Sequence, residues 1–374
     1  MSEPVAGAVT GSVTAPASSS SGPLRLGLLG AARISPLSII SPAKATGSRL
    51  VAVAARDLTR AQEFATEHGI ERALASYADL LADVEVEAVY NPLANALHGP
   101  WNIKAAQAGK HVLAEKPSAA NADEAREVQA AVDAAGVTYL EAFHFPYHPL
   151  FRRVVELIGS GAIGEVTHVD VPLLMPDPGA SDPRWVLGLA GGATMDLGCY
   201  SLACLNLLGQ QFCGGPLAIT AAQAVERASA PGVDSHLFLQ GGFPSGATGS
   251  GGSDMDAADW SFTLVVTGSE GEIVVPKFPL PHEDDRLILR RSASAPLSRT
   301  SPEPGAELTR EHEGDVVEHL GNRSSYTYQL EAFTAAVRDG APVATDAAFS
   351  VANMEAVDAA YRAAGLDPRP SLAF

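Results

Sequence analysis

The chain has 374 residues, of which 46% are hydrophobic and 18% charged, a composition and length that support a sizeable core and about two domains. Its formal net charge of −18 argues against nucleic acid or an anionic membrane as a main partner, because phosphate binding needs clustered lysine and arginine. No apolar run approaches the roughly 20 residues that a membrane helix requires.

The N-terminus and the cysteines bear on the compartment. Residues 1–22 are small, polar and almost uncharged, without the basic and apolar regions of a secretory signal, so we expect a disordered tail. Cys199, Cys204 and Cys213 match no zinc or redox motif and are expected to be reduced and semi-buried, with a catalytic thiol as the alternative. The protein is therefore predicted to be cytoplasmic.

Short apolar runs alternate with helical stretches through residues 23–143. We expect strands at 24–30, 49–55, 86–92, 111–115 and 137–143, and helices at 34–45, 59–68 (with Thr59 as N-cap), 98–108 and 122–135. Near-continuous apolar strands with helices between them indicate a parallel sheet covered on both faces. The pattern predicts an α/β fold that begins with a Rossmann dinucleotide-binding domain.

Ligands of such sheets bind beyond the carboxyl ends of the strands. The loops that follow Leu29, Ala55, Tyr90 and Ala114 therefore share one rim, and the Glu-Lys-Pro triplet that contains Lys116 lies on it. Lysine prefers open solvent, so its position at the mouth of an apolar strand favours a chemical role over that of an ordinary edge residue.

The loop after the first strand reads GLLGAARIS. A G-x-G-x-x-G fingerprint would place its glycines at Gly30, Ala32 and Ser35. Only the first is glycine, so the motif alone is weak, and a plain strand-to-helix turn is the alternative. Alanine is the smallest departure at the point where the backbone approaches a pyrophosphate. Gly30, Ala32, Arg33 and Ile34 are the candidate cofactor contacts of this loop.

The second strand ends in Ala55-Arg56-Asp57. An NAD site usually places a carboxylate here to bind the ribose 2′-hydroxyl, whereas a 2′-phosphate needs an arginine. Ala55 stands where the acid is expected, and Arg56 can bind a phosphate through two nitrogens. The pattern favours NADP; Asp57 keeps NAD possible, and Arg56 as a surface residue is the remaining alternative.

Residues 144–374 have a different character. Alternating strands are expected at 166–175, 217–226, 261–268 and 271–276, the last two forming a hairpin, with helices at 325–339 and 347–364 and long loops at 241–254 and 292–306. Period-two alternation with one polar face indicates an antiparallel sheet. We predict an α+β substrate-binding and oligomerisation domain with a large, open, mostly antiparallel sheet, whose exposed face could join two subunits.

A stretch with helical spacing lies within this half, at 191–209. Asp196 and Tyr200 are four residues apart and hence on one face of the helix. A lysine ammonium near the tyrosine would favour the phenolate and make it a better acid or base near neutral pH. The alternative is an aspartate that stabilises the helix dipole and a tyrosine at a domain seam.

Five segments occur in a characteristic order: GLLGAARI, VYNPLANALH, AGKHVLAEKPSA, LEAFHFPYHP and GGATMDLGCYSL. Together they resemble the Gfo/Idh/MocA family, the glucose–fructose oxidoreductase and inositol dehydrogenase-like enzymes. The resemblance covers roughly residues 24–210 and continues more weakly through 326–333 and 350–361. The most similar branch is that of the NADP-dependent D-xylose 1-dehydrogenases and dimeric trans-dihydrodiol dehydrogenases.

The resemblance implies roles for three residues. Lys116 would be the catalytic lysine, Tyr200 the acid or base, and Asp196 its partner in substrate positioning. Tyr200 would take the proton of a sugar hydroxyl while hydride leaves carbon for the nicotinamide. Lys116 would stabilise the developing negative oxygen and lower the pKa of the tyrosine.

The resemblance also implies cofactor contacts and an assembly. Asn91, Pro92 and His98 would line the nicotinamide ribose, and Glu115 would contact the cofactor together with Lys116. The open sheet would form a homodimer or a higher homo-oligomer.

This chain departs from the family pattern at several positions. Pro146 replaces an arginine that close relatives often carry, which puts a substrate contact in doubt. Ala193 replaces the third glycine expected before the catalytic helix. His144 and His148 could be metal ligands, but we expect them to be structural or substrate-facing and predict no metal.

The predicted function is an NADP-dependent oxidoreductase that transfers hydride between a sugar, such as the aldose D-xylose, and the nicotinamide. A trans-1,2-dihydrodiol dehydrogenase is the alternative among enzymes. A non-catalytic NAD(P)-binding regulator is the alternative from another class. Such a regulator need not keep Lys116, Asp196 and Tyr200 together, so their joint presence favours an enzyme.

Overall fold

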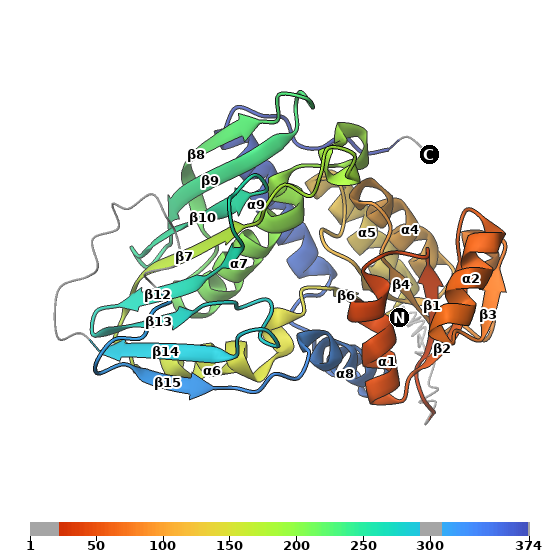
Figure 1. Ribbon diagram of the computed structural model, residues 1–374, viewed down its shortest axis with the longest axis horizontal. Coiled ribbons are helices and arrows are strands. Elements are labelled where there is room, and N and C mark those ends of the chain that lie inside the picture. The colour runs from red at the N-terminus through yellow and green to blue at the C-terminus, as the bar shows by residue number, and fades with distance from the viewer. Residues whose placement is uncertain (1–21, 292–308, 373–374) are drawn as a thin grey trace, which may run out of the picture.

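The structure is a computed structural model that describes residues 22–291 and 309–372. The expected N-terminal tail, apart from Gly22, and the expected loop at 292–306 lie outside these residues. Figure 1 shows two sheets side by side, a small one within the first half of the chain and a large one formed by the second half.

The described part of the first half forms a six-stranded parallel sheet in the order β3-β2-β1-β4-β5-β6. Its strands are β1 (Arg25–Leu29), β2 (Arg49–Ala54), β3 (Arg72–Leu74), β4 (Ala88–Asn91), β5 (His111–Ala114) and β6 (Tyr139–Glu141). The Rossmann-type sheet is confirmed. Sequence analysis missed β3 because this edge strand has only three residues, and none of them is fully buried.

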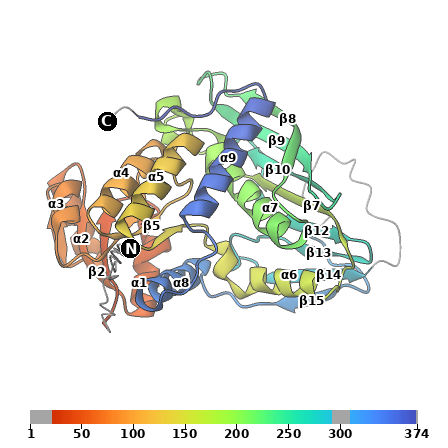
Figure 2. The same ribbon diagram turned by 180° about the vertical axis from the view of Figure 1, so that it is seen from behind.

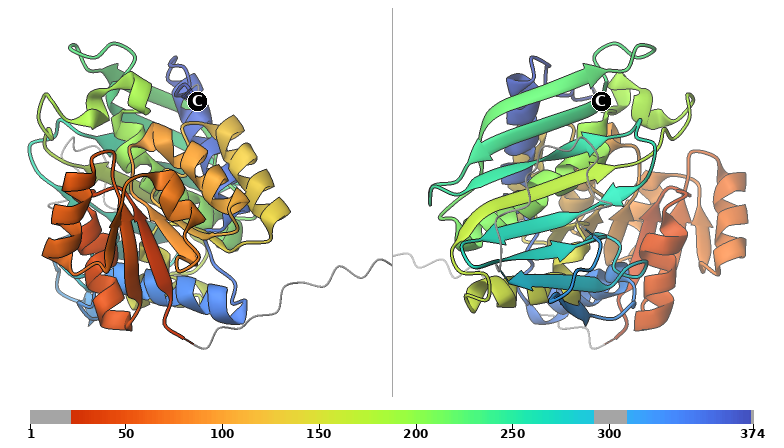
Figure 3. Two further views of the ribbon diagram at one scale, coloured as in Figure 1. Left: turned by 90° about the vertical axis from the view of Figure 1, so that its right-hand side faces the viewer. Right: turned by 60° about the vertical axis from the view of Figure 1, so that its left-hand side comes forward.

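Helices cover both faces of this sheet (Figure 3, left). They are α1 (Ser41–Thr46), α2 (Leu58–His68), α3 (Tyr77–Ala82), α4 (Asn95–Gln107) and α5 (Ala122–Ala135). The prediction of Thr59 as an N-cap is wrong. The Asp57 carboxylate accepts hydrogen bonds from the backbone N–H groups of Thr59 (2.8 Å) and Arg60 (3.3 Å), so the helix begins one residue earlier.

The described part of the second half forms a nine-stranded sheet in the order β15-β14-β13-β12-β7-β10-β9-β8, with β11 paired to β7. Its strands are β7 (Val166–Leu174), β8 (Ala218–Glu226), β9 (Asp234–Gly242), β10 (Thr248–Asp254), β11 (Ser261–Phe262), β12 (Leu264–Gly268), β13 (Gly271–Val275), β14 (Arg286–Arg291) and β15 (Val316–His319). All pairs are antiparallel except β7 with β10. The predicted mostly antiparallel sheet is confirmed.

The expected loop at 241–254 is wrong, because most of it is strand β10 and the end of β9. The glycines of β10 serve close packing instead of a loop. A Cβ atom at Gly251 would lie 2.8 Å from the carbonyl oxygen of Val171 and closer still to the Ser201 hydroxyl. Ser201 in turn accepts a hydrogen bond from the backbone N–H of Gly252 (3.0 Å). Glycine therefore lets a helix approach the sheet directly.

One face of the large sheet is covered by helices and the other is open. Figure 2 shows α6 (Pro149–Gly159), α7 (Cys199–Phe212) and α9 (Ala347–Ala363) over the covered face, while Figure 3, right, shows the open face without a described helix in front of it. Phe238 on β9 and Val225 on β8 are partly exposed. The use of this face as a subunit interface stays a prediction.

The last two helices join the halves of the molecule. Helix α8 (Ser325–Asp339) belongs to the second half of the sequence, but it lies beside α1 in Figures 1 and 2. Its Leu330 and Phe333 pack in the same core cluster as Leu26 and Leu28 of β1. Helix α9 likewise packs against α5. The chain thus returns to the Rossmann domain after it has built the large sheet.

All three cysteines are unpaired and buried. Burial raises the pKa of the Cys199 and Cys204 thiols, which disfavours the reactive thiolate and argues against a catalytic thiol. No helix within the described ranges is both long and apolar enough to cross a membrane.

Candidate active site

Two adjoining cavities lie at the carboxyl ends of the Rossmann strands. The distal cavity, of about 970 Å³, contains Gly30 and Arg56 in its wall. The central cavity, of about 730 Å³, contains Lys116 and Tyr200. The two cavities share Ala32, Pro92, Leu93, Ala94 and Pro183 as lining residues. They form one groove along the rim where such sheets bind ligands.

The distal cavity begins at the first strand-to-helix turn. Gly30 has a φ of 105°, and a Cβ atom there would approach Leu93 Cδ2 to 3.0 Å, so glycine is needed at this turn. Its backbone N–H donates to Ala54 O (2.7 Å), which joins the turn to β2. This single glycine allows a close backbone approach although the fingerprint is incomplete.

Two arginines lie at the far end of the distal cavity. Arg56 follows β2, and within the described ranges no hydrogen bond or ion pair to its guanidinium is found. Arg60 donates from Nη2 to Ala31 O (2.7 Å). Burial raises the pKa of Tyr77, and the two arginine charges act in the opposite direction, so all three groups lie close together. Sequence analysis identified Arg56 and missed Arg60.

The central cavity brings together the three predicted catalytic residues. Lys116 Nζ donates to Asp196 Oδ1 (2.9 Å) and to Asp196 O (2.8 Å). The same nitrogen lies 5.1 Å from the centroid of the Tyr200 ring. Asp196 belongs to a π-helical turn at Thr194–Gly198 that continues into α7, which explains why Asp196 and Tyr200 share a face.

Asp196 is held between two cations. Its Oδ2 forms an ion pair with Arg184 Nε (2.8 Å), opposite the contact to Lys116. Burial favours the neutral acid, but Lys116 and Arg184 outweigh it and lower the pKa of Asp196. Burial also works against the ammonium, yet the charge of Asp196 raises the pKa of Lys116. Both partners are therefore charged at neutral pH. Arg184 was missed by sequence analysis.

The expected lowering of the tyrosine pKa is wrong in this structure. Burial raises the pKa of Tyr200 well above its usual range. The Lys116 ammonium donates to Asp196 and lies over the face of the tyrosine ring instead of at the hydroxyl. The hydroxyl oxygen lies 3.2 Å from His144 Nε2. Tyr200 is accordingly a neutral phenol at neutral pH.

Glu115 and Tyr90 form the wall behind Lys116. The Tyr90 hydroxyl donates to Glu115 Oε1 (2.5 Å) and lies 2.6 Å from the Ser38 hydroxyl. Burial raises the pKa of Glu115, although the Tyr90 hydrogen bond and the Lys116 charge oppose the shift. Glu115 lines the central cavity as predicted.

Two predicted ribose contacts have different positions. His98 lines the central cavity, and its ring bridges Pro117 O and Leu93 O, each at 2.7 Å. Burial lowers the pKa of His98 to about 4. Asn91 lies behind the cavity wall, fully buried, where its amide donates to Asn102 Oδ1 (2.8 Å). The structure therefore gives Asn91 a supporting position instead of a place in the cavity lining.

The remaining cofactor candidates lie at the rim. Arg33 and Ile34 both line the central cavity. The Arg33 side chain is 83% exposed and donates to Asp182 Oδ2 (3.2 Å). This bond joins the cofactor loop to the segment that carries Arg184, across the mouth of the cavity.

His144 and His148 have protein partners on both ring nitrogens. His148 Nδ1 accepts from the backbone N–H of Leu150 (3.0 Å) at the start of α6, and its Nε2 lies 3.1 Å from Arg323 O. Besides its contact with Tyr200, His144 contacts the Ser325 hydroxyl through Nδ1 (2.8 Å). Across the described residues, no group of three or more potential metal-ligating side chains could hold an ion.

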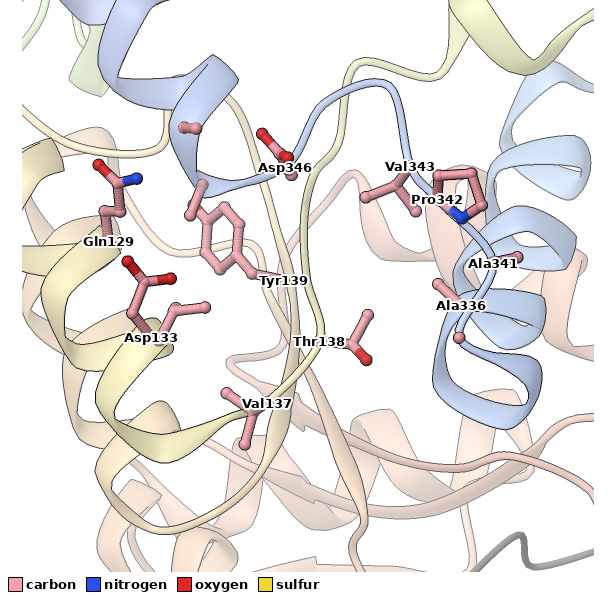
Figure 4. Close-up of a pocket in the computed structure, with 14 residues that line it drawn as sticks. Gln129, Asp133, Val137, Thr138, Tyr139, Ala336, Ala341, Pro342, Val343 and Asp346 are labelled. Carbon is pink, nitrogen blue, oxygen red and sulfur yellow. The ribbon is translucent and has the colours of Figure 1, made fainter. Parts of the chain in front are cut away.

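Another hollow, of about 340 Å³, lies elsewhere. Figure 4 shows Gln129 and Asp133 on one side of it, Pro342 and Val343 on the other, and Tyr139 between them. It adjoins the beginning of β6 and hence the amino-end edge of the sheet. Ligands of such sheets bind at the opposite edge, so the groove with Lys116 is the candidate active site.

Two family models match the chain in succession. The model described as "Oxidoreductase family, NAD-binding Rossmann fold" matches residues 24–143, and the GFO/IDH/MocA C-terminal domain matches residues 151–274. A curated D-xylose 1-dehydrogenase (NADP(+)) of Haloferax volcanii is 37% identical over 344 residues, which cover 91% of this chain and 97% of that protein. The chain belongs to the Gfo/Idh/MocA family of oxidoreductases. The predicted family and the predicted enzyme class are thereby confirmed.

Other relatives of this Gfo/Idh/MocA protein include the trans-1,2-dihydrobenzene-1,2-diol dehydrogenase of Mus musculus. It is 32% identical over 265 residues, which cover 70% of this chain and 77% of that one. Among solved structures, a 3-ketoreductase from Actinomadura kijaniata in complex with NADP and TDP-benzene superimposes with a TM-score of 0.79 at 25% identity. That match covers 91% of this chain and 98% of the ketoreductase.

Proposed function

We propose that the chain is an NADP-dependent dehydrogenase that transfers hydride between the hydroxyl-bearing carbon of a sugar, such as the aldose D-xylose, and the nicotinamide. One observation carries the proposal. The Lys116–Asp196 ion pair and the Tyr200 phenol meet in the central cavity, directly beside a cavity that Arg56 lines. The similarity to a D-xylose 1-dehydrogenase supports the sugar as substrate.

The distal cavity suits NADP. Gly30 gives the close backbone approach that a pyrophosphate needs at a helix N-terminus. Arg56 and Arg60 supply positive charge where a 2′-phosphate would lie. The place of the NAD-type acid is taken by Ala55, and one carboxylate oxygen of Asp57 is used to cap α2. The donor set therefore favours NADP, with NAD as a weaker alternative.

The residues of the central cavity have different roles toward the substrate. The two hydrogen bonds to Asp196 fix Lys116 Nζ, and its third proton remains for a substrate oxygen. Tyr200 Oη exchanges a proton with the reacting hydroxyl. Arg184 holds Asp196 from the other side. The nicotinamide, when bound, supplies the hydride acceptor or donor.

The test is reduction of NADP and of NAD by the purified protein, followed by absorbance of the reduced cofactor, against aldoses, polyols and trans-dihydrodiols. Turnover of a pentose or hexose with NADP is the expected result. Turnover of dihydrodiols alone would support the second enzyme class, which the Mus musculus relative favours. Tight NADP binding without turnover of any compound would favour the regulator.

The proposal also includes an oligomeric assembly and a cellular compartment. We place the protein in the cytoplasm as a homodimer or higher homo-oligomer that pairs through the open face of the large sheet. Residues 144–374 then serve both to bind substrate and to join subunits. Light scattering measures the mass of the assembly. Comparing the purified chain with a variant that carries Phe238→Glu on the open face tests the proposed oligomer.

A further inference from the structure

The Tyr200 hydroxyl has a hydrogen-bond partner that is not among the predicted catalytic residues. Several ionisable groups lie near the phenol, namely Lys116, Asp196, Glu115, Cys199 and Tyr326. Within the described part of the chain, however, the one hydrogen bond found at the hydroxyl is to His144 Nε2, at 3.2 Å. The acid–base group of the proposed reaction is thus oriented by a histidine from the loop after β6.

The position of the His144 ring is itself fixed. Its Nδ1 lies 2.8 Å from the Ser325 hydroxyl at the start of α8, and both residues are buried. The ring lies against Tyr326, with centroids 3.9 Å apart and the planes inclined by 35°. Since packing and a hydrogen bond both restrict the imidazole, its Nε2 is held toward Tyr200.

The charge of His144 is determined by its surroundings. Burial lowers the pKa of His144 to about 3, and the positive charge of Lys116 and the neighbouring His282 and His148 act in the same direction. The ring is therefore neutral at neutral pH. A neutral imidazole donates from one nitrogen and accepts at the other, so the partner of Nδ1 decides what Nε2 presents to Tyr200.

The Ser325 hydroxyl is suited to donate a hydrogen bond to His144 Nδ1. It is the first residue of α8, and among the contacts of the described residues its hydroxyl bonds to His144 alone. If the Ser325 hydroxyl donates to Nδ1, then Nε2–H donates to Tyr200 Oη, and the proton of the phenol is left to face the cavity. The opposite tautomer would draw the phenol proton away from the substrate.

We propose that His144 is a positioning residue for Tyr200: Ser325 holds it in the Nε2–H tautomer, and Nε2–H donates to the tyrosine oxygen. The proposal rests on the proposed function, since it assigns Tyr200 as the acid or base. The N–H donor directs the phenol proton toward the substrate oxygen and stabilises the phenolate once that proton is shared. No atom is transferred to or from His144.

The kinetic test compares His144→Leu with His144→Gln, whose amide can still donate. Removing the donor destabilises the phenolate, so the basic form of Tyr200 appears at higher pH. We expect kcat of His144→Leu to fall roughly 10- to 100-fold, with KM nearly unchanged. The rise of kcat/KM that accompanies formation of the basic form of Tyr200 should move to higher pH. His144→Gln should recover much of the loss.

The matched control is His148→Asn. His148 is as buried as His144, but it caps α6 and does not contact Tyr200, and asparagine can serve as a cap. This variant should keep the wild-type pH profile. A His144→Leu profile that coincides with wild type, or that falls in kcat without a shift along the pH axis, would overturn the proposal.

A second measurement does not depend on turnover. Nitrogen NMR of ¹⁵N-histidine-labelled protein, with His144 assigned from the His144→Gln spectrum, reports the tautomer directly. A neutral ring protonated at Nε2, which shifts toward the Nδ1–H form in Ser325→Ala, is expected. An Nδ1–H ring or an imidazolium in wild type refutes the inference. Failure of every substrate in the panel would instead refute the proposed function and leave the NMR result to stand alone.

Discussion

The cofactor side and the substrate side of the groove are built in different ways. On the cofactor side, Gly30 and Glu115 follow directly after a parallel strand and Arg56 is the second residue after one, so the sheet itself aligns them. On the substrate side, Arg184 and Tyr200 come from segments that the large sheet and its helices bring together. The first arrangement follows from strand pairing within one sheet, whereas the second depends on packing between elements outside that sheet.

This difference has a mechanical consequence. A strand-end loop keeps its place as long as the Rossmann sheet is intact. The helix that carries Asp196 and Tyr200 needs an anchor from elsewhere. Asp234 of β9 supplies it, accepting from both the backbone N–H (2.7 Å) and the hydroxyl (2.6 Å) of Thr194. Arg369, close to the C-terminus, forms a buried ion pair with the same aspartate.

The largest effect is expected at the point where the two sides meet. Lys116→Ala should lower kcat by roughly three orders of magnitude, because Asp196 loses its partner and the reacting oxygen loses its cation. Binding of NADP, measured by fluorescence titration, should change little. Lys110→Ala, at the amino end of the same strand, is the control and should keep kcat. Near-normal turnover of Lys116→Ala would show that the lysine has no catalytic role.

Removing the buried ion pair that anchors the substrate side should also destabilise the protein strongly. Arg369→Leu leaves the Asp234 carboxylate buried without its cation, which should destabilise the fold by about 3–5 kcal/mol in urea titrations. The exposed pair of Arg323 and Glu331 is the comparison, since Arg323→Ala should scarcely move the midpoint. Equal shifts for the two variants would contradict the assigned role of the buried pair.

The cofactor side can be tested without disturbing the fold. Arg56→Ala should lower kcat/KM for NADP by roughly 10- to 100-fold, because a charged hydrogen bond to the 2′-phosphate is lost. The value for NAD should stay within a small factor, since NAD lacks that phosphate. An equal loss with both cofactors would mean that Arg56 acts on a part that the two share.

The last comparison concerns Glu141, at the seam between the two halves. Its carboxylate accepts from the backbone N–H of Ser118 (2.8 Å) and from the Ser350 hydroxyl (2.7 Å) of α9. Burial raises the pKa of Glu141 from 4.5 to about 7. The folded state thus binds this proton more tightly than the unfolded state does. The resulting stabilisation of the fold is fully present below about pH 4.5 and is lost as pH rises through 7.

Glu141→Gln should flatten this dependence. Unfolding free energies measured between the two pKa values should fall with pH by of order 1–3 kcal/mol in wild type and by less in the variant. An identical slope in both proteins would show that another group titrates over this range.

Sequence patterns predicted where the residues at the strand ends lie. The apolar runs of the parallel strands placed Lys116, Glu115 and Arg56 on one rim, and the i, i+4 spacing placed Asp196 beside Tyr200. Similar reasoning could have found Arg60, which lies in the first turn of the helix that follows Arg56. Arg184 carried no such signal, because it lies in a single 3-10 turn at Pro183–Trp185 and its ion-pair partner Asp196 belongs to another element.

The errors have physical causes of the same kind. The glycines of β10 suggested a loop, but they permit contact with α7 that only the packed structure reveals. The lysine was expected to lower the tyrosine pKa, but the structure directs its protons to Asp196 and leaves burial to dominate at Tyr200. The expectation that His144 is structural or substrate-facing is not among these errors, but no sequence pattern showed its contact with Tyr200, 56 residues away.

The amino-acid sequence by itself determined the fold class, the family and the residue types of the proposed chemistry, because these depend on periodicity and on motifs of neighbouring residues. The tertiary structure alone decided which groups pair, which charges persist and which way Tyr200 is oriented. Those properties depend on burial and on distances between remote segments, and no local pattern in the chain encodes them.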